Sequence, residues 1–222
     1  MDVDIRDSAS LKPAELDVLS QLLRDSGSPL DDRILDQQVE SFPRLSLVTA
    51  DEEVVGFLFG SLERIGGTPC VLWGLGTARD PSEAEPVVSA MTTELYRRAA
   101  ISFPDEDVLV AGRFAHPTVY QLFDGLQEPV PRPGYKASGE DRAWGRRLAK
   151  RFGCDDRYDD RAFRTEGQGA PEPLLDVELT GKPAPAVAEL MASLEPERGD
   201  TLIAFGWAPA ESLAAVLAKN GR

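Results

Sequence analysis

The sequence predicts a mixed α+β fold in which helices flank one central sheet. Three strand-like runs follow one another at 45–49, 54–62 and 69–75, a spacing typical of an antiparallel meander. A helix-length run at 83–100 comes next. A short, continuous apolar run at 107–112 follows it and is typical of a buried central strand.

The first forty residues are expected to form one strand and two helices. Residues 3–6 alternate in polarity as a short strand does. Residues 12–25 carry a proline in the expected first turn and leucines at helical spacing, so they are expected to form a helix. A second helix is expected at 31–40, where Asp31 or Asp32 favours the N-terminus.

Recognisable turns join the central elements. The polar turn 50–53 favours a hairpin, and Gly66-Gly67 reverses the chain again before the third strand of the meander. Apolar residues of the long helix at 83–100 share one broad face: Val87, Val88, Met91, Leu95 and Ala99. Pro117 is expected to start a short helix at 118–123.

The C-terminal part is less regular in pattern. Residues 128–134 contain three prolines and predict an extended connector. A basic helix is expected at 138–151. The remaining expected elements are short strands at 162–165 and 174–179, a helix at 185–194, a strand at 201–207 and a final helix at 209–219.

Composition and charge narrow the class of protein. The 222 residues carry a net charge of −14, which argues against general nucleic-acid or anionic-membrane binding. The two cysteines, Cys70 and Cys154, form no CxxC pair, and His116 is the sole histidine, so no structural zinc site is expected and no other metal is predicted. No apolar run reaches membrane-spanning length and no signal peptide is evident, so a cytoplasmic protein is expected.

The element order over residues 3–126 resembles that of the GNAT acyltransferase fold. The opening Ile5-Arg6 and the run Glu53-Val54-Val55-Gly56-Phe57 are similar to short sequence features of that superfamily. The resemblance implies a GNAT-like core at 1–127. It also implies a C-terminal extension at 128–222, which completes or extends the same domain. A generic α+β sandwich with the same order of elements is the alternative.

The resemblance also implies a place for acyl-CoA. In the family, a splayed parallel strand pair and the loop before the long helix hold this cofactor. The positions here that correspond are Leu75 and Gly76 at the end of a strand and Arg79 in the loop. They are the candidate cofactor-binding residues.

The loop itself departs from the family pattern. Glycines normally let backbone N–H groups approach the pyrophosphate, but the window 79–87 has none. Asp80, Glu83 and Glu85 would face a pyrophosphate with like charge. The alternative interpretation is a self-capped helix start, with Asp80 or Ser82 as the N-cap. That interpretation counts against ordinary acyl-CoA binding.

His116 and Tyr120 are the candidate catalytic pair. His116 follows the predicted buried strand and is the group whose ordinary pKa lies nearest neutrality, although it could also be a plain helix cap. Tyr120 is four residues on and is expected to face the same way. The family's catalytic tyrosine does not carry over, because the two alignments of its motif place Gln121 or Phe123 at that position.

The basic helix is a candidate anion-binding element through Arg142, Arg146 and Arg147. Residues 132–164 carry more basic than acidic side chains, in contrast to the rest of the chain. The alternative is a solvated helix face opposite an apolar stripe that includes Trp144.

Two functions are therefore expected. The first is a divergent acyltransferase that moves an acyl group from a thioester, on CoA or on a carrier, to an amine of a small molecule or protein. The second is a pseudo-GNAT domain that has lost cofactor binding and serves as a ligand-binding or protein-interaction module.

Overall fold

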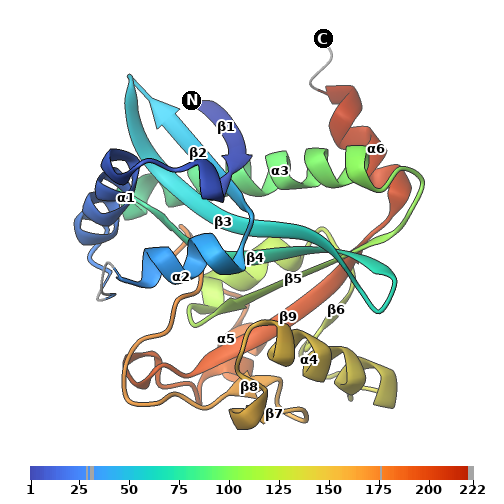
Figure 1. Cartoon of the computed structure of the whole chain (residues 1–222). Helices are drawn as coiled ribbons and strands as arrows, with labels where there is room; N and C mark the ends of the chain where they lie inside the picture. Colours follow the sequence, from blue (N-terminus) through green and yellow to red (C-terminus); the bar gives the residue numbers. More distant parts are fainter. Residues whose placement is uncertain (29, 31–32, 176, 220–222) are drawn as a thin grey trace.

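The computed structural model describes residues 1–28, 30, 33–175 and 177–219. Its strands are β1 (Asp2–Asp7), β2 (Arg44–Ala50), β3 (Glu53–Ile65), β4 (Thr68–Ala78), β5 (Val108–Phe114), β6 (Gln127–Val130), β7 (Tyr158–Asp159), β8 (Arg164–Thr165) and β9 (Thr201–Ala208). In this described part they form one sheet with the order β1-β2-β3-β4-β5-β9-β8-β7, and β6 also pairs with β9. The predicted mixed sheet flanked by helices is confirmed (Figure 1).

The α-helices are α1 (Pro13–Asp25), α2 (Arg33–Ser41), α3 (Ala84–Ser102), α4 (Gly139–Arg151), α5 (Pro185–Met191) and α6 (Ala210–Lys219). Two 3-10 helices, η2 (Pro81–Glu83) and η3 (Pro117–Phe123), flank α3 and β5. Helix α3 packs against β1 to β4 and beside α6, whereas α4 packs against β9 (Figure 1). Within the described ranges, no helix has the length and apolar character needed to cross a membrane.

The N-terminal half of the sheet is an antiparallel meander, as the sequence predicts. Strand β2 pairs with β1 and β3, and β3 pairs with β4. The chain then crosses over through α3, because a parallel partner strand needs a connection of this length. Strand β5 accordingly runs parallel to β4, and β9 from the C-terminal end of the chain pairs antiparallel with β5.

Three expectations for the C-terminal part need correction. Residues 128–130 of the expected connector 128–134 belong to β6, which pairs antiparallel with β9. Of the strand expected at 174–179, the described residues 174–175 and 177–179 form no regular strand and make one isolated bridge, at Leu175. The strand expected at 162–165 is shortened to β8.

The expected N-terminal residues of the second helix, Asp31 and Asp32, lie outside the described residues.

A glycine sets the contact between the sheet and α3. A Cβ atom added at Gly56 would lie 2.3 Å from Cγ1 of Val87 on α3 and 3.1 Å from the carbonyl oxygen of Thr77 on β4. The Val-Gly-Phe run in β3 therefore has a packing role: Gly56 allows α3 to lie close against the sheet while Phe57 is fully buried.

We predict that Gly56→Ala lowers the free energy of unfolding by about 1–3 kcal/mol, because the added methyl group overpacks the β3–α3 contact. Urea unfolding followed by circular dichroism measures this. Adding Val87→Ala should restore part of the loss. Gly125→Ala is the control, since a Cβ atom there has no neighbour within 4 Å. An equal loss in both single variants would contradict the packing role.

Candidate functional site

The parallel strands β4 and β5 separate at one end. They pair from Cys70 opposite Leu109 to Trp73 opposite Gly112. Beyond that point β4 continues along β3 to Ala78, and β5 continues along β9. The splayed pair implied by the GNAT resemblance is therefore present in the fold.

The chain itself enters this gap. We call residues 171–175 and 177–179 the inserted segment. The backbone N–H of Gly76 on β4 donates to the carbonyl oxygen of Leu174 over 3.2 Å, and the N–H of Leu175 donates to the carbonyl oxygen of Arg113 on β5 over 3.3 Å. Leu174 and Leu175 are both buried. The inserted segment thus bridges the two strands at the place where they diverge.

Charged side chains fix the start of the inserted segment. Glu172 accepts from Nη2 of Arg157 at 2.8 Å and from Nη2 of Arg113 at 3.1 Å. All three side chains are largely removed from solvent. Toward the other end, the backbone N–H of Leu179 donates to Oγ1 of Thr118 over 3.0 Å. The segment is therefore held at both ends as well as in the middle.

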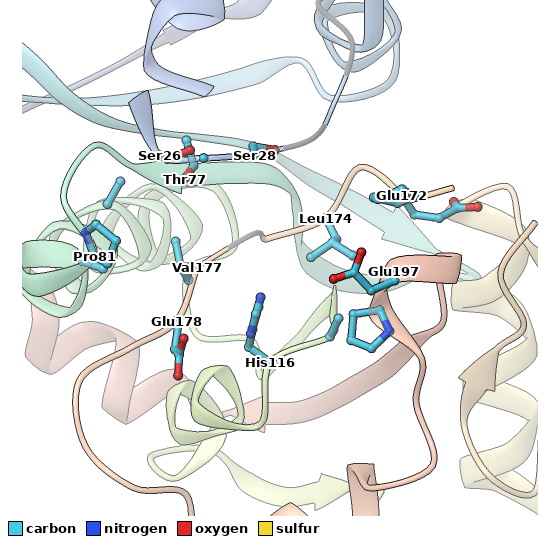
Figure 2. A pocket seen from close by; sticks show the side chains of 16 residues that line it. Ser26, Ser28, Thr77, Pro81, His116, Glu172, Leu174, Val177, Glu178 and Glu197 are labelled. Atoms are coloured by element: carbon cyan, nitrogen blue, oxygen red, sulfur yellow. The ribbon is translucent and has the colours of Figure 1, made fainter. Parts of the chain in front are cut away.

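A pocket of about 320 Å³ remains beside the inserted segment. It lies among the end of β4, the start of η2 and the loop that carries His116 (Figure 2). Its charged or titratable lining groups are Glu172, Glu178, Glu197 and His116, and no described Lys or Arg lines it. Because Glu172 is paired with two arginines, Glu178 and Glu197 set the negative potential of the pocket.

The predicted cofactor residues Leu75 and Gly76 lie at the gap, but their backbone donors are engaged within the chain. The N–H of Leu75 donates to Oε1 of Gln38 over 2.9 Å, and that of Gly76 bonds to Leu174. A Cβ atom at Gly76 would lie 2.7 Å from a methyl group of Leu58. Gly76 is therefore required for internal packing as it stands.

The predicted cofactor residue Arg79 does not line the pocket. Its Nη1 donates to the carboxylate of Glu53, and its Nε lies 3.8 Å from Oδ2 of Asp25. Its backbone N–H donates to the carbonyl oxygen of Val55 over 2.8 Å. Arg79 therefore ties the end of β4 to neighbouring elements.

The loop before α3 caps itself. Oδ1 of Asp80 accepts from the N–H and the hydroxyl of Ser82, at 2.8 and 2.7 Å. These two hydrogen bonds lower the pKa of Asp80 below its ordinary value. Glu85, in the first turn of α3, accepts from the hydroxyl of Thr180. The Asp80 cap that the sequence offered as an alternative is present, but it caps η2; the N-cap of α3 itself is Glu83, which makes no side-chain capping hydrogen bond.

His116 and Tyr120 do not converge on one site. His116 lines the pocket, whereas Tyr120 is buried and its hydroxyl donates to the carbonyl oxygen of Pro131 over 2.6 Å. The expectation that they face the same way assumed an α-helix, in which residues four apart differ by about 40°. The segment from Pro117 is the 3-10 helix η3, and His116 lies outside it as an N-cap with extended backbone, so α-helical spacing does not relate the two side chains.

Burial disfavours the ionised form of Tyr120. It raises the pKa of Tyr120 to about 12, and the nearby carboxylate of Asp124 adds to this effect. The ring packs against Phe114 and Phe123. Tyr120 therefore serves the aromatic core of this region.

The three arginines of the predicted anion-binding helix divide between two surfaces. Arg142 and Arg146 line a separate hollow formed with residues 131–137 and 160–163. Arg147 lies outside that hollow, and its guanidinium is 4.9 Å from the ring centroid of Trp144. Arg147, although it directly follows Arg146, therefore faces a different surface from the other two.

Residues of the inserted segment were not anticipated as site residues. Glu172 and Glu178 lie in a stretch with no periodic pattern. The sequence did offer a sign that Arg113 matters: a charged residue directly after the apolar run 107–112 needs a partner when it is buried. Within the described part of the chain, no group of three His, Cys, Asp or Glu residues is placed to hold a metal ion.

We predict that Tyr120→Phe lowers the free energy of unfolding by about 1–2 kcal/mol at pH 8, because the carbonyl of Pro131 loses its donor. The folded pKa exceeds the ordinary value of 10, so the wild type also loses stability as the pH rises from 10 toward 12. The variant lacks that contribution and should fall less steeply. Urea unfolding at pH 8, 10 and 11.5 tests this, and parallel curves would contradict it.

We predict that Glu172→Gln loosens the inserted segment and lowers stability by about 2–4 kcal/mol, because two partly buried arginines lose their counter-ion. Hydrogen exchange at the amides of Gly76 and Leu175 should accelerate. Glu178→Gln is the control on the same segment, since Glu178 is exposed. Unchanged exchange in Glu172→Gln would show that the ion pairs do not hold the segment.

No family model matches the chain, and no curated protein matches it. The solved structures to which it is similar include the ribosomal-protein-S18-alanine N-acetyltransferase from Escherichia coli, with 8% identity, 93% of this chain and 94% of that chain covered, and a TM-score of 0.49. Escherichia coli ElaA is 17% identical over 62% of this chain and 93% of its own, with a TM-score of 0.43. Aminoglycoside 6'-acetyltransferase type Ii is 13% identical over 60% of this chain and 88% of its own, with a TM-score of 0.44. Similarity at this level concerns the fold alone. With the parallel β4–β5 pair splayed after a meander and a crossover helix, the chain has a divergent GNAT-type fold.

Proposed function

We propose that this protein is a ligand-binding module on a GNAT-type fold, and that its pocket beside His116 takes a small aliphatic amine. In this proposal the module does not carry out acyl-CoA-dependent transfer. The observation that supports it most directly is the inserted segment, whose backbone bridges Gly76 on β4 and Arg113 on β5.

The inserted segment is part of the core. Its apolar side chains are at most 6% exposed: Leu174, Leu175, Val177 and Leu179. Exposing four such side chains would cost about 6–12 kcal/mol. A ligand at a hundredfold excess over its Kd supplies about 2.7 kcal/mol. Binding of acyl-CoA at ordinary concentrations would therefore not displace the segment.

The charged residues beside the gap also argue against acyl-CoA binding. Acyl-CoA brings a pyrophosphate, which is favoured by free N–H groups at a helix N-terminus and by cationic side chains. Here Asp80 caps the 3-10 helix η2 that leads into α3, Arg79 is paired with two carboxylates, and the pocket contains Glu178 and Glu197. These residues do not fit a pyrophosphate.

The same pocket suits a cation. His116 lies between Glu178 and Glu197 in Figure 2. An ammonium group placed there can donate to either carboxylate, while Val177 and Ala84 offer apolar contact to a short methylene chain. A volume of about 320 Å³ suits a small ligand.

Acyl transfer from a thioester to an amine is the second candidate. One observation favours it: β4 and β5 still diverge after Trp73 and Gly112, as a fold that holds an acyl-CoA would require. This candidate requires the inserted segment to leave the gap. Release of the segment in Glu172→Gln should then create acetyl-CoA binding.

We predict that spermidine at tenfold excess over its Kd raises the melting temperature by about 3–5 °C. Acetyl-CoA at millimolar concentration should cause no shift. Glu178→Gln should weaken the spermidine effect because the ammonium group loses a carboxylate partner. Differential scanning fluorimetry measures all three.

The matched control is Glu189→Gln, which removes the same charge from an exposed position on α5 outside the pocket. It should leave the spermidine shift unchanged. If acetyl-CoA stabilises the wild type and thiol is released when spermidine is added, the proposal of a ligand-binding module is contradicted and acyl transfer is supported instead. An equal loss of the spermidine shift in both variants would indicate nonspecific screening of the protein's negative charge.

A further inference from the structure

A second hollow lies beside helix α4, away from the pocket that His116 lines. It has a volume of about 960 Å³ and shares no lining residue with the pocket beside His116. Its walls are the segment 131–137, the outward face of α4 and the turn 160–163. Figure 1 places α4 on the far side of β9 from α3. We call it the basic hollow.

The walls of the basic hollow are strongly cationic. Its basic lining residues are Arg132, Lys136, Arg142, Arg146 and Arg161, and Asp160 is its one acidic lining residue among the described residues. Asp160 pairs with Arg146 and neutralises that one charge. Four cations therefore remain on one concave surface of a protein whose net charge is −14.

Carbonyl oxygens hold two of these arginines in place, and Arg132 also interacts with the carboxylate of Asp141. Nη1 of Arg132 donates to the carbonyl oxygen of Pro129 over 2.9 Å, and Nη1 of Arg142 donates to that of Ala137 over 3.1 Å. A carbonyl oxygen orients a guanidinium but carries no formal charge. Each arginine also has four further N–H donors to offer, so the pair is preorganised for an anion.

An aromatic ring completes the arrangement. The guanidinium of Arg132 lies 3.5 Å from the ring centroid of Tyr135. The Tyr135 hydroxyl donates to Oδ2 of Asp141 over 2.9 Å, and the same oxygen accepts from the N–H of Ser138. Asp141 is thus hydrogen-bonded at the start of α4, and Tyr135 is held at the rim of the basic hollow.

The arrangement is unfavourable without an anion. Arg142 brings an un-neutralised charge from α4, whereas the charge of Arg146 is paired with Asp160. Lys136 and Arg161 approach from two other segments and add to the repulsion. An anion bound between them would remove it.

From these observations we propose that the basic hollow is a binding site for a small molecule with several phosphate groups. Phosphate oxygens accept paired N–H groups from arginines, and the four cations not paired with Asp160 match a ligand with three to four negative charges. A concave site on an otherwise acidic protein favours a small polyanion over a long nucleic acid, because the surrounding surface repels an extended chain of phosphates.

The test uses inorganic triphosphate as the probe, with the full-length protein in isothermal titration calorimetry at 50 and 200 mM salt. We expect saturable binding with one site, weakened by salt. Arg142→Ala should weaken it at least about tenfold through loss of a charge-assisted hydrogen bond. Lys136→Ala, at an exposed position, should weaken it without affecting folding.

Arg147→Ala is the matched control, because Arg147 is on the same helix but outside the basic hollow. It should leave the Kd unchanged, and circular dichroism should show all variants folded. Absence of triphosphate binding at millimolar concentration would overturn the proposal. Equal weakening by Arg147→Ala and Lys136→Ala would also overturn it, as would much tighter binding of a single-stranded RNA oligonucleotide than of triphosphate.

Discussion

The insertion of the chain between β4 and β5 is the constraint on which the rest of the site depends. Two backbone hydrogen bonds, from Gly76 to Leu174 and from Leu175 to Arg113, close a gap that the sheet topology opens. The ion pairs of Glu172 with Arg113 and Arg157 hold the segment there. Because Arg113 belongs to β5, the central strand and the inserted segment stabilise each other.

The insertion also determines the chemistry left to the pocket. It uses the main-chain groups of β4 that a splayed sheet would offer to an extended ligand, and it brings Glu178 to the rim beside His116. Asp80 uses the N–H groups at the start of the neighbouring helical segment. What remains is a small, negatively charged pocket next to a histidine. A cation suits such a pocket better than a pyrophosphate does.

Positive charge is gathered elsewhere, in the basic hollow on α4. The two sites therefore have opposite electrostatic preference within one domain-sized chain. This separation makes a net charge of −14 compatible with the proposed anion site. Each site can be altered by single substitutions that leave the other's lining residues intact.

Much of the fold could be predicted from local pattern. The meander, the long helix α3, the buried strand β5 and the cap at Asp80 each depend on residues close in sequence, so periodicity and turn chemistry were sufficient. Sequence spacing did not show that His116 lines the pocket while the Tyr120 hydroxyl is bonded to Pro131, because spacing does not distinguish a short α-helix from a 3-10 helix with an extended N-cap. The strand expected at 174–179 also failed, because its partners lie at the ends of two strands that diverge.

The sequence by itself determined the order of elements as far as η3, the glycine at position 56 that admits α3, and the cap at Asp80 in a loop without glycines. Only the tertiary structure decided what fills the gap between β4 and β5. Gly76 and Leu174, or Arg113 and Glu172, are distant in the chain, and no local periodicity records such a pairing. The free energy of burying Leu174 and Leu175 becomes available only after the sheet has formed and splayed.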